Sequence, residues 1–567
     1  RAEGIKKKLG PNTITTIEEN PYILIDLTVR VNFAQIDQIA IKMGMDLEND
    51  KRIRSGIKYA LKLSTNNGHC AVLYENLIQF VKDLLNVSEV MIENNIIFLK
   101  TKNEIVLEDR ENQEWVYLYN YYVAEKNVAE SLIALDNYLN VKEISNFEKK
   151  LKKIEKHSDL ELSEKQREAV IAVQEHNVCV ITGGPGTGKT TIIKTIIEMY
   201  KQEEKKVVLC APTGRAAKRM SEATGEEAKT LHRLLEIGKT SSDELQNIDP
   251  NVEVAPLDAD VIIVDEVSMV DIFLMNYLLQ AIYKGTKLVL VGDSNQLPSV
   301  GPGNVLKDII QSERLTTITL NKIFRQAAKS KIILNSHKVN EGISIFSKDE
   351  QNENEELLED FFFINETNKL KVLENIISLC TGRLEKYGNY TFAQNIQVIS
   401  PTKKGELGTK ELNKSLQQAI NPESEEKNER KYIDSVFREG DRIMQIKNNY
   451  DIYWEKREPT LEMGKGVFNG EYGTILNIDE VEKKVKIKFD DDKLVWYNFD
   501  ELEQIEHSYC ITVHKAQRKR VRCSYYANST GCANVTYSYI AIHCNDKSKK
   551  TINCNRSSEC CKLYDTK

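Results

Sequence analysis

The stretch Gly183-Gly184-Pro185-Gly186-Thr187-Gly188-Lys189-Thr190 fits the pattern G-x-x-x-x-G-K-[ST] of a phosphate-binding loop. An apolar segment, NVCVIT (residues 177–182), precedes the loop and TIIKTIIEMY (191–200) follows it, so we expect a strand to enter the loop and a helix to leave it. Glycines allow backbone N–H groups to converge on phosphate oxygens, and the start of a helix adds positive potential. The pattern therefore predicts that Lys189 reaches the β- and γ-phosphates of a nucleoside triphosphate and that Thr190 ligates Mg²⁺. The residues expected around the nucleotide phosphates are Gly183, Gly184, Pro185, Gly186, Thr187, Gly188, Lys189, Thr190 and Thr191.

A second segment, VIIVDE (residues 261–266), supplies the carboxylates that such a loop needs. Its apolar run predicts a buried strand that ends at Asp265 and Glu266. Asp265 can hold Mg²⁺ through water, and Glu266 can orient and deprotonate the attacking water. An Asp-Glu pair at a strand end is often only solvated. Following a phosphate loop in the same region, however, it predicts hydrolysis of a nucleoside triphosphate.

Length and composition indicate a globular protein of several domains. The chain has 567 residues and a mass of 64.9 kDa, whereas a single hydrophobic core rarely exceeds about 250–300 residues. Apolar residues make up 41% and charged residues 29%, which is typical of soluble proteins and excludes wholesale disorder. The net charge of −7 excludes a uniformly basic protein but is compatible with a local basic groove.

The ends of the chain lead to two further expectations. No apolar run reaches the roughly 18 residues of a membrane span, and no signal peptide opens the sequence, so we expect a cytoplasmic protein without membrane contact. Because the sequence opens at Arg1 rather than at a methionine, we expect the chain to be incomplete at its N-terminus.

Alternating strands and helices from about residue 160 onward predict an α/β fold with parallel sheets covered on both faces. The apolar strands expected there are VVLCAP (207–212), VIIVDE (261–266), KLVLVGD (287–293) and IQVISPT (396–402). Before this region, residues 1–150 favour helices, with apolar positions at helical spacing in 53–63 and 77–85 and short strands at 96–106.

Residues 437–504 show a different periodicity. VKIKF (485–489) and KLVWYNF (493–499) alternate apolar and polar residues with period two, on either side of a short acidic turn. This alternation predicts a hairpin within a small β-barrel that is inserted into the α/β region.

A series of further motifs indicates what the hydrolysis drives. In chain order they are LSEKQREAV around Gln166, APTGRAAKRM (211–220), KTLHRLL (229–235), DEVSM (265–269), GDSNQLPSVGPG (292–303), IFRQ (323–326), SPTKKGELGTKELN (400–413) and ITVHKAQ (511–517). The series resembles the superfamily 1 DNA helicases, and within them the RecD-like branch of superfamily 1B. The resemblance covers about residues 159–517. It implies two RecA-like lobes with ATP between them and single-stranded DNA across their tops.

The resemblance also implies roles for individual residues. Gln166 would read the adenine, Gln296 would sense the γ-phosphate, and Arg325 would act as an arginine finger from the second lobe. Together with Lys189 and Glu266, the last two form the expected catalytic set. The residues implied to line the DNA path carry groups suited to phosphate contacts without sequence readout. They are Thr213, Arg215, His232, Thr402, Thr512 and His514. Taken singly, Thr213 could instead cap a helix and His232 could be a hydrogen-bonded core residue.

The implied domain organisation follows the same resemblance. It comprises a helical region at 1–150, a first lobe at 151–310 with a β-hairpin insert near 237–256, a second lobe at 311–517 with the barrel near 437–504, and a tail at 518–567. Residues 1–60 resemble the family's helix-hairpin-helix region through IEENPY (17–22) and FAQIDQIA (33–40). Arg30-Val31-Asn32 stand where glycines would let the backbone approach DNA, so a purely structural bundle is equally open.

The implied function is ATP- and Mg²⁺-dependent movement along single-stranded DNA. The family resemblance implies translocation from 5′ to 3′, with the hairpin insert splitting the duplex. The expected partners are single-stranded DNA and duplex junctions, the expected process is DNA repair or recombination, and we expect a monomeric motor. The sequence itself shows no protein partner and no step size.

The tail departs from the family pattern. After residue 517 the family continues with a glycine, an acidic-aromatic pair, a buried strand and a later Tyr-Thr-Ala-x-Thr-Arg motif, but this chain reads RKRVRCSYYAN (518–528). Codons for 518–528 exist that, after removal of one base, encode GSEFDVVIMP, and the same shift over 540–550 permits LLYTAMTRAKK. We therefore expect that a single-base insertion altered residues 518–567, whether by sequencing error or as a true frameshift. This also explains why six of the eleven cysteines lie there.

Two consequences and one alternative follow for the tail. The frameshift removes the last strands of the second lobe and its catalytic arginine, so we expect impaired helicase activity. A zinc-binding tail is the alternative, but the cysteine spacing shows no paired C-x₂-C.

Three functions therefore remain open for the whole chain. The first is an ATP-dependent DNA helicase, impaired in this chain. The second is a nucleotide- and DNA-binding remnant without turnover. The third is a phosphate-loop ATPase that acts on RNA or protein. The ordered series of motifs favours the first.

Overall fold

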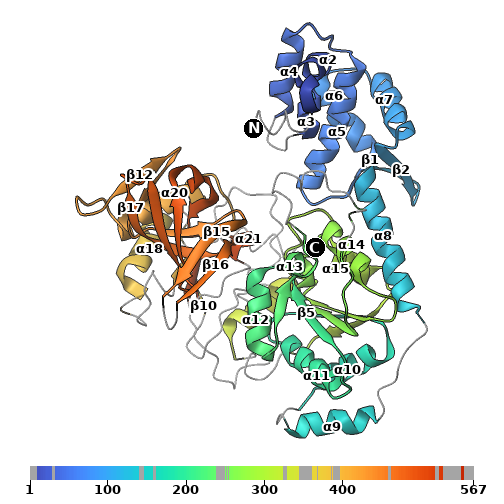
Figure 1. The fold of residues 1–567 in the computed structure, drawn as a ribbon, viewed down its shortest axis with the longest axis vertical. Helices are drawn as coiled ribbons and strands as arrows, with labels where there is room; N and C mark the ends of the chain where they lie inside the picture. The colour runs from blue at the N-terminus through green and yellow to red at the C-terminus, as the bar shows by residue number, and fades with distance from the viewer. Residues whose placement is uncertain are drawn as a thin grey trace. The chain divides into compact units, whose positions relative to one another are not determined.

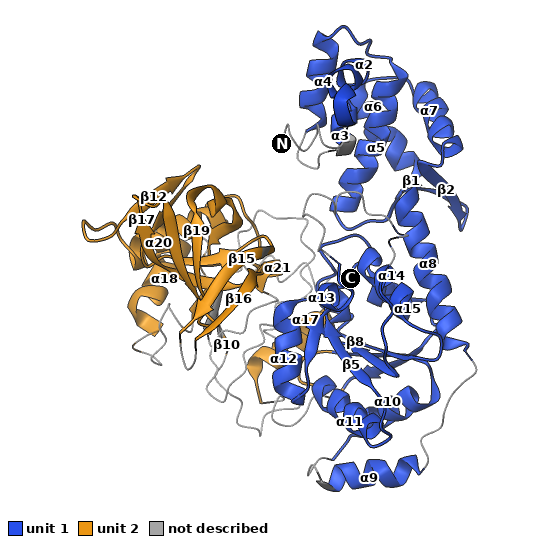
Figure 2. Ribbon diagram, in the orientation of Figure 1, with its two compact units in different colours: residues 1–183, 188–321 blue, residues 184–187, 322–567 orange. Residues whose placement is uncertain are grey.

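A computed structural model describes most of the chain, and its elements fall into two compact units (Figure 2). Unit 1 comprises residues 1–183 and 188–321, and unit 2 comprises 184–187 and 322–567. The residues outside the description are 1–8, 28–31, 139–145, 158–160, 238–249, 251, 253, 323–328, 344–360, 365, 367, 385, 387–395, 458–460, 517–522, 528–550 and 555–567. Arg325, most of the expected hairpin insert near 237–256 and most of the tail therefore lie outside it. The domain boundaries expected at 150, 310 and 517 remain predictions.

Unit 1 begins with a helical bundle that carries a small antiparallel sheet (Figure 1). Its helices are α2 (Thr13–Glu19), α3 (Ile23–Leu27), α4 (Phe33–Lys42), α5 (Asp50–Asn66), α6 (Tyr74–Leu85), α7 (Glu89–Thr101) and α8 (Tyr119–Asp136). Its strands are β1 (Ala71–Leu73), β2 (Ile105–Arg110) and β3 (Gln113–Leu118). Ile53, Ile57 and Leu77 are buried in its core, as the helical spacing of 53–63 and 77–85 predicted.

The prediction of short strands at 96–106 is wrong for its first half. Residues up to Thr101 belong to α7, and β2 begins only at Ile105. Ile92, Ile96 and Leu99 recur at helical spacing and are buried in the bundle core. Packing of this helix face therefore outweighs the strand propensity of the short apolar run.

The second part of unit 1 is a six-stranded parallel sheet in the order β6-β5-β7-β8-β4-β9. Its strands are β4 (Val178–Gly183), β5 (Val207–Ala211), β6 (Ala228–Thr230), β7 (Val261–Val264), β8 (Lys287–Gly292) and β9 (Thr316–Leu320). The helices that connect or flank them are α9 (Phe147–His157), α10 (Glu164–Glu175), α11 (Lys189–Lys201), α12 (Gly214–Thr224), α13 (Leu231–Leu234), α14 (Ile272–Ala281) and α15 (Val305–Gln311). The strands expected at 207–212, 261–266 and 287–293 are confirmed.

Each face of this sheet is covered by helices (Figure 1). Val178 and Val180 belong to one apolar cluster, which includes side chains of α8, α14 and α15, whereas Cys179 and Ile181 belong to the other, with α9, α10 and α11. Successive strand residues point to opposite faces of the sheet, so an uninterrupted apolar run such as β4 contributes side chains to both apolar clusters. This explains why the central strands are apolar throughout rather than alternating.

Unit 2 contains a second parallel sheet, in the order β10-β23-β22-β11-β21. Its strands are β10 (Phe361–Ile364), β11 (Ile396–Ser400), β21 (Cys510–Thr512), β22 (Cys523–Ala527) and β23 (Thr551–Cys554). The helices of the unit include α17 (Lys331–Asn340), α18 (Lys369–Ser378), α20 (Thr409–Ile420) and α21 (Val513–Ala516). The strand expected at 396–402 is confirmed.

We expected this sheet to lack its last strands because of the altered tail, but the structure has two tail strands, β22 and β23, in it. β22 pairs in parallel with β11, and β23 lies between β22 and β10. Backbone N–H and C=O groups at a sheet edge can pair with any extended segment, and Tyr525 and Tyr526 are residues that favour strands. Backbone pairing of this kind depends little on which side chains the segment carries. Residues 518–567 do not contain the Tyr-Thr-Ala-x-Thr-Arg motif that the resemblance leads us to expect.

The insert of unit 2 is an antiparallel sheet around its own apolar core, as the period-two pattern predicted. Its strands are β14 (Arg442–Gln445), β15 (Asn449–Lys456), β16 (Glu462–Val467), β17 (Tyr472–Asp479), β18 (Lys484–Phe489), β19 (Leu494–Asn498) and β20 (Ile505–His507). They follow the order β16-β15-β19-β18-β17-β14-β20, and a hairpin of β12 (Glu429–Tyr432) and β13 (Ser435–Arg438) precedes them. Val485, Ile487, Val495 and Tyr497 are all buried in the core. The expected fold is therefore confirmed: two parallel sheets, a barrel-type insert and a helical N-terminal region.

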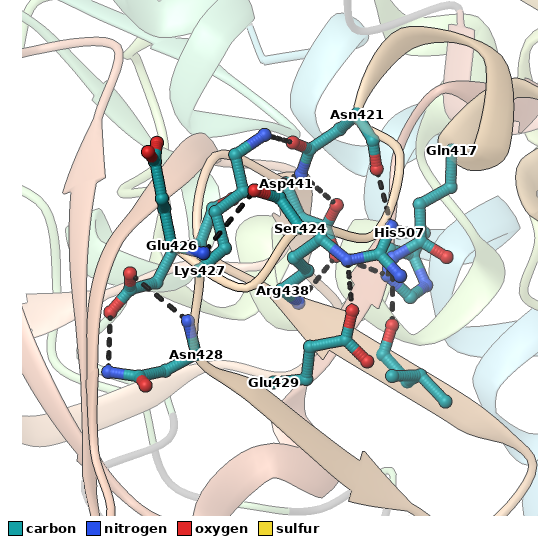
Figure 3. A network of polar contacts seen from close by, with 12 residues as sticks. Gln417, Asn421, Ser424, Glu426, Lys427, Asn428, Glu429, Arg438, Asp441 and His507 are labelled. Atoms are coloured by element: carbon teal, nitrogen blue, oxygen red, sulfur yellow. Dashed lines mark hydrogen bonds and ion pairs between the residues drawn. The ribbon is translucent and has the colours of Figure 1, made fainter.

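One buried carboxylate joins the insert to the parallel-sheet part of unit 2 (Figure 3). Asp441 is fully buried just before β14 and accepts five hydrogen bonds of 2.6–3.0 Å. The donors are Gln417 Nε2, Asn421 Nδ2, Arg438 N, His507 Nε2 and Tyr509 Oη. They come from both points where the chain enters and leaves the insert, so a single carboxylate fixes its attachment.

Replacing Asp441 with Ala should destabilise the insert by at least about 3 kcal/mol, because several buried donors lose their acceptor. Asp441→Asn should destabilise the insert less than Asp441→Ala does, because an amide keeps one of the two acceptor oxygens. Two of the three tryptophans, Trp454 and Trp496, lie in the insert, so urea unfolding followed by tryptophan fluorescence in a Trp115→Phe background reports on it.

Glu480→Ala is the matched control, because Glu480 lies in the insert and its exposed ion pair joins it to Arg430 of the preceding hairpin. That pair should contribute no more than about 1 kcal/mol. Equal urea midpoints for Asp441→Ala and Glu480→Ala would contradict the role assigned to the buried carboxylate.

Candidate nucleotide and DNA site

The predicted phosphate loop lies at the carboxyl end of β4, between that strand and α11. Gly186 and Gly188 have φ of +80° and +83°, a conformation that favours glycine, so the sequence pattern has a direct backbone reason. Thr187 Oγ1 donates to the carbonyl of Gly184 at 2.8 Å, and Lys189 Nζ donates to the carbonyl of Gly183 at 2.5 Å. The lysine is thus folded back over the loop, where a phosphate could replace the carbonyl as its partner.

The two predicted carboxylates follow β7 directly. The Glu266 amide donates to Asp265 Oδ1 at 2.9 Å, and Glu266 itself has φ of +56° and ψ of +41°. This left-handed conformation costs a non-glycine residue roughly 1–2 kcal/mol. Such strain is concentrated at functional sites, so it supports a specific task for the Glu266 side chain.

Burial raises the pKa of both carboxyl groups. The pKa of Glu266 rises to about 7, first through loss of water and then through the neighbouring Asp265 charge, while Lys189 and Arg219 act against the rise. Burial also raises the pKa of Asp265, and its hydrogen bond from the Glu266 amide and the Lys189 charge oppose that shift. A carboxylate of raised basicity beside a cation is the arrangement that a general base requires.

Gln296 reaches the same group of charges through Asp293. Its Nε2 lies 3.4 Å from Asp293 Oδ2, and Asp293 is almost fully buried after β8 and raises the pKa of Glu266. Ser294 and Thr182 are joined by a hydrogen bond of 3.2 Å, which ties the ends of β8 and β4 together. Lys189, Glu266 and Gln296, three of the four predicted catalytic residues, therefore lie at one edge of one sheet.

Gln166 is buried, and its side chain caps its own helix. Ser163 N donates to Gln166 Oε1 at 3.0 Å, and Gln166 N lies 3.4 Å from Ser163 Oγ, which completes a capping box at the start of α10. The amide oxygen therefore has a structural partner. The resemblance implies that Gln166 recognises adenine. This stays a prediction, in which the side-chain amide nitrogen would make the contact.

Gln166→Glu separates the two roles of this side chain. Glu keeps the oxygen acceptor of the capping box but lacks an N–H donor when ionised. We expect the protein to keep its thermal stability while its preference for ATP over GTP and UTP falls, about 10-fold in kcat/KM. Hydrolysis measured with the three nucleotides tests this, and Gln166→Ala, which also loses the cap, is the comparison. An unchanged preference in Gln166→Glu would exclude adenine recognition by this residue.

The predicted DNA contacts of unit 1 follow neighbouring strands of the same sheet. Thr213 lies after β5 and caps α12, with its hydroxyl accepting from Ala216 N at 3.2 Å, so the helix-cap alternative is present in the structure. Arg215 lies in the first turn of α12. His232 is exposed in α13, after β6, so the alternative of a core histidine is wrong.

The predicted DNA contacts of unit 2 also share one sheet edge. Thr402 follows β11, Thr512 ends β21, and His514 lies in α21 directly after it. β11 and β21 are parallel neighbours with Ser400 opposite Thr512, so their carboxyl ends meet. The pKa of His514 is lowered by loss of water around the ring and by the Lys403 charge, which places Lys403 near it.

Two residues near the site were not predicted from the sequence. His337 of α17 packs on the phosphate loop: its Nε2 lies 3.4 Å from the Pro185 carbonyl, and a Cβ added to Gly184 would lie 2.9 Å from its Cε1. Residues 184–187 and α17 belong to the same unit (Figure 2). Arg219 Nη1 lies 3.9 Å from Glu266 Oε1. Arg219 falls inside the quoted motif 211–220, four residues after Arg215, which was the available signal.

The residues present fit a magnesium nucleotide. A loop with two left-handed glycines at a helix start is a nest of N–H donors for phosphate oxygens. The Thr190 hydroxyl and the Asp265 carboxylate are hard oxygen donors of the kind that Mg²⁺ prefers. Among the described residues, no group of three or more His, Cys, Asp and Glu side chains forms a metal site of its own.

A parallel sheet with a phosphate loop after one strand and an Asp-Glu pair after another defines a phosphate-loop nucleoside triphosphatase. Three family models match this chain: an AAA domain at residues 166–302, an ATP-dependent RecD-like DNA helicase SH3 domain at 412–489, and an ATP-dependent RecD2 DNA helicase HHH domain at 1–71. The second match overlaps the antiparallel insert, and the third falls on the N-terminal helical bundle.

Curated relatives agree with these matches. The ATP-dependent RecD2 DNA helicase of Deinococcus radiodurans is 28% identical over 527 residues, which are 91% of this chain and 67% of that protein. The RecBCD enzyme subunit RecD of Buchnera aphidicola subsp. Schizaphis graminum is 30% identical over 471 residues, 71% of this chain and 73% of that protein. The chain belongs to the RecD-like family of ATP-dependent DNA helicases.

Among solved structures, a Pif1 helicase from Bacteroides in complex with ADP-AlF3 and ssDNA is 16% identical, with a TM-score of 0.38 over 69% of this chain and 92% of that chain. In the described part of the chain, no helix combines the length and the apolar character that a membrane crossing requires.

Proposed function

We propose that this chain is a translocase that couples ATP hydrolysis to 5′-to-3′ movement along single-stranded DNA and opens duplex junctions, in DNA repair or recombination. The observation that carries the proposal is the convergence on one sheet edge of the phosphate loop, the Asp265–Glu266 pair, Gln296 and the start of α12. A hydrolytic centre and a strand-binding element that share one rigid sheet can affect each other directly.

The chemistry follows from the residues at that edge. Lys189 neutralises charge on the β- and γ-phosphates, and Thr190 and Asp265 would hold Mg²⁺, which adds positive charge there when bound. Glu266 accepts a proton from the water that attacks the γ-phosphorus, so the products are ADP and inorganic phosphate. Gln296 reports the state of the γ-phosphate through Asp293. Arg325, outside the described residues, is proposed as the arginine that stabilises the transition state.

The proposed DNA path carries hydroxyl, guanidinium and imidazole groups, which can all contact phosphates. Each of the six residues lies at or just after the carboxyl end of a parallel strand: Thr213, Arg215 and His232 in unit 1, and Thr402, Thr512 and His514 in unit 2. Contacts of this kind position a strand without reading its sequence, as a translocase requires. We propose a monomeric, cytoplasmic motor.

ATPase assays with and without single-stranded DNA test the central proposal. We expect single-stranded DNA to raise the hydrolysis rate, and Lys189→Ala to lower the stimulated rate at least about 100-fold because phosphate charge is no longer neutralised. RNA of the same length and sequence is the control polymer, and Lys194→Ala in the same helix is the control variant. Nucleotide binding without hydrolysis would instead support the remnant. Stimulation by RNA alone would support an RNA-dependent ATPase.

The tail generates a separate expectation, because the proposed frameshift would remove the arginine of the Tyr-Thr-Ala-x-Thr-Arg motif. We expect the 567-residue chain to unwind a forked duplex poorly. A version in which residues 518–567 are replaced by the other reading frame should unwind at least about 10-fold faster, since one arginine at the transferred phosphate has an effect of this size or larger. A fork with only a 5′ tail and one with only a 3′ tail test the polarity. Equal unwinding by both chains would contradict the impairment.

A further inference from the structure

Arg219 is the cation that approaches Glu266 from outside the predicted site. Its Nη1 lies 3.9 Å from Glu266 Oε1, and both side chains are largely enclosed, with 26% and 18% of their surface exposed. Arg219 Nε is buried and has no hydrogen-bond partner. An enclosed guanidinium with an unused donor, aimed at a strained carboxylate, is expected to have a task beyond surface charge.

The helix that carries Arg219 also begins at the expected DNA path. α12 starts after Thr213, and Arg215 and Arg219 are four residues apart, so they lie on the same face, one turn from each other. The first turn therefore presents Arg215 near the edge where DNA is proposed to bind. The next turn presents Arg219 to Glu266.

The packing of α12 differs between its two ends. Ala216 and Ala217 bury its first turns with small side chains, in a separate cluster with Ala211. Met220 anchors the later turns in the apolar cluster shared with α9, α10 and α11, and Ala228 N donates to Ser221 Oγ at 2.8 Å. Alanine contacts bury little area, so the first turns can shift at smaller cost than the end of the helix.

Arg219 is one of two cations that act on the Glu266 carboxylate. Asp265 and Asp293 repel the Glu266 carboxylate, and Lys189 and Arg219 attract it. When a nucleotide is bound, Lys189 is directed to the phosphates in the proposed mechanism. Arg219 is then the remaining cation of this group that can hold the carboxylate in position.

We propose that Arg219 is a positioning residue that holds the Glu266 carboxylate toward the attacking water and transmits DNA occupancy at the start of α12 to it. The proposal rests on the proposed function. A shift of the first turns of α12 on DNA binding moves the guanidinium relative to Glu266, so hydrolysis becomes faster only when the strand is present. A distance of 3.9 Å without ligands is compatible with this, because catalytic contacts often tighten only in the complex.

A purely structural ion pair is the competing explanation. A pair of this length contributes little to stability, so it would not explain an enclosed guanidinium with an unused Nε. The two explanations differ in what a substitution changes: a structural pair affects folding and nucleotide binding, whereas a positioning residue affects the DNA-stimulated kcat.

The test compares Arg219→Gln, Arg219→Lys and Lys218→Gln in the full chain. Lys218 is exposed next to Arg219 on the same helix and serves as the charge-matched control. The measurements are kcat and KM for ATP with and without oligo-dT, the affinity for fluorescein-labelled oligo-dT, and the binding of a fluorescent ADP. We expect Arg219→Gln to lower the oligo-dT-stimulated kcat about 10-fold, with KM, ADP binding and oligo-dT affinity within about twofold. Arg219→Lys should recover most of the rate, because it keeps the charge.

Each outcome decides between the proposals. A stimulated kcat for Arg219→Gln within twofold of the wild type overturns the inference, as does a loss that lies entirely in oligo-dT affinity. A loss shared by Lys218→Gln, or accompanied by lost ADP binding, assigns Arg219 a structural role and also overturns it. If the wild type binds ADP but shows no stimulation by oligo-dT, the proposed function itself fails, which is a distinct result.

Discussion

The site depends on one constraint of parallel sheets: every strand delivers its carboxyl end to the same edge. In unit 1 the end of β4 that enters the phosphate loop, the carboxylate pair after β7, Asp293 after β8 and the start of α12 after β5 all lie there. Backbone hydrogen bonds between the strands fix this convergence regardless of the side chains that follow. The proposed hydrolytic centre and the proposed DNA-binding start of α12 therefore share one sheet edge.

Burial at that edge makes the two carboxyl groups more basic than they would be in water. Loss of water raises the pKa of Asp265 and of Glu266, and Lys189 and Arg219 limit the rise. The left-handed backbone of Glu266 adds strain that the surrounding sheet sustains. The contrast with Asp441 is instructive, because that equally buried carboxylate accepts five hydrogen bonds and serves to hold the insert of unit 2 in place.

Strong local patterns were sufficient for much of the fold. The apolar runs of β5, β7, β8 and β11 and the period-two alternation of β18 and β19 identified these strands, because burial on two faces or on one face leaves a different periodicity. The same reasoning misassigned residues 96–101, where a short apolar run suits a strand or a buried helix and only packing against neighbouring helices decides. It also did not anticipate that 523–527 pairs with β11, because backbone pairing leaves little trace in side-chain chemistry.

By itself, the sequence determined the residues whose chemistry is local: the glycines that need left-handed φ, the lysine and threonine after them, and two carboxylates at a strand end. Tertiary structure alone decided which distant side chains meet these groups. Periodicity places Arg219 on the face of Arg215, but only the packing of α12 against β5 and β6 brings this face to Glu266. Likewise, the joining of both ends of the insert by Asp441 depends on contacts between residues up to 68 positions apart, which no local pattern encodes.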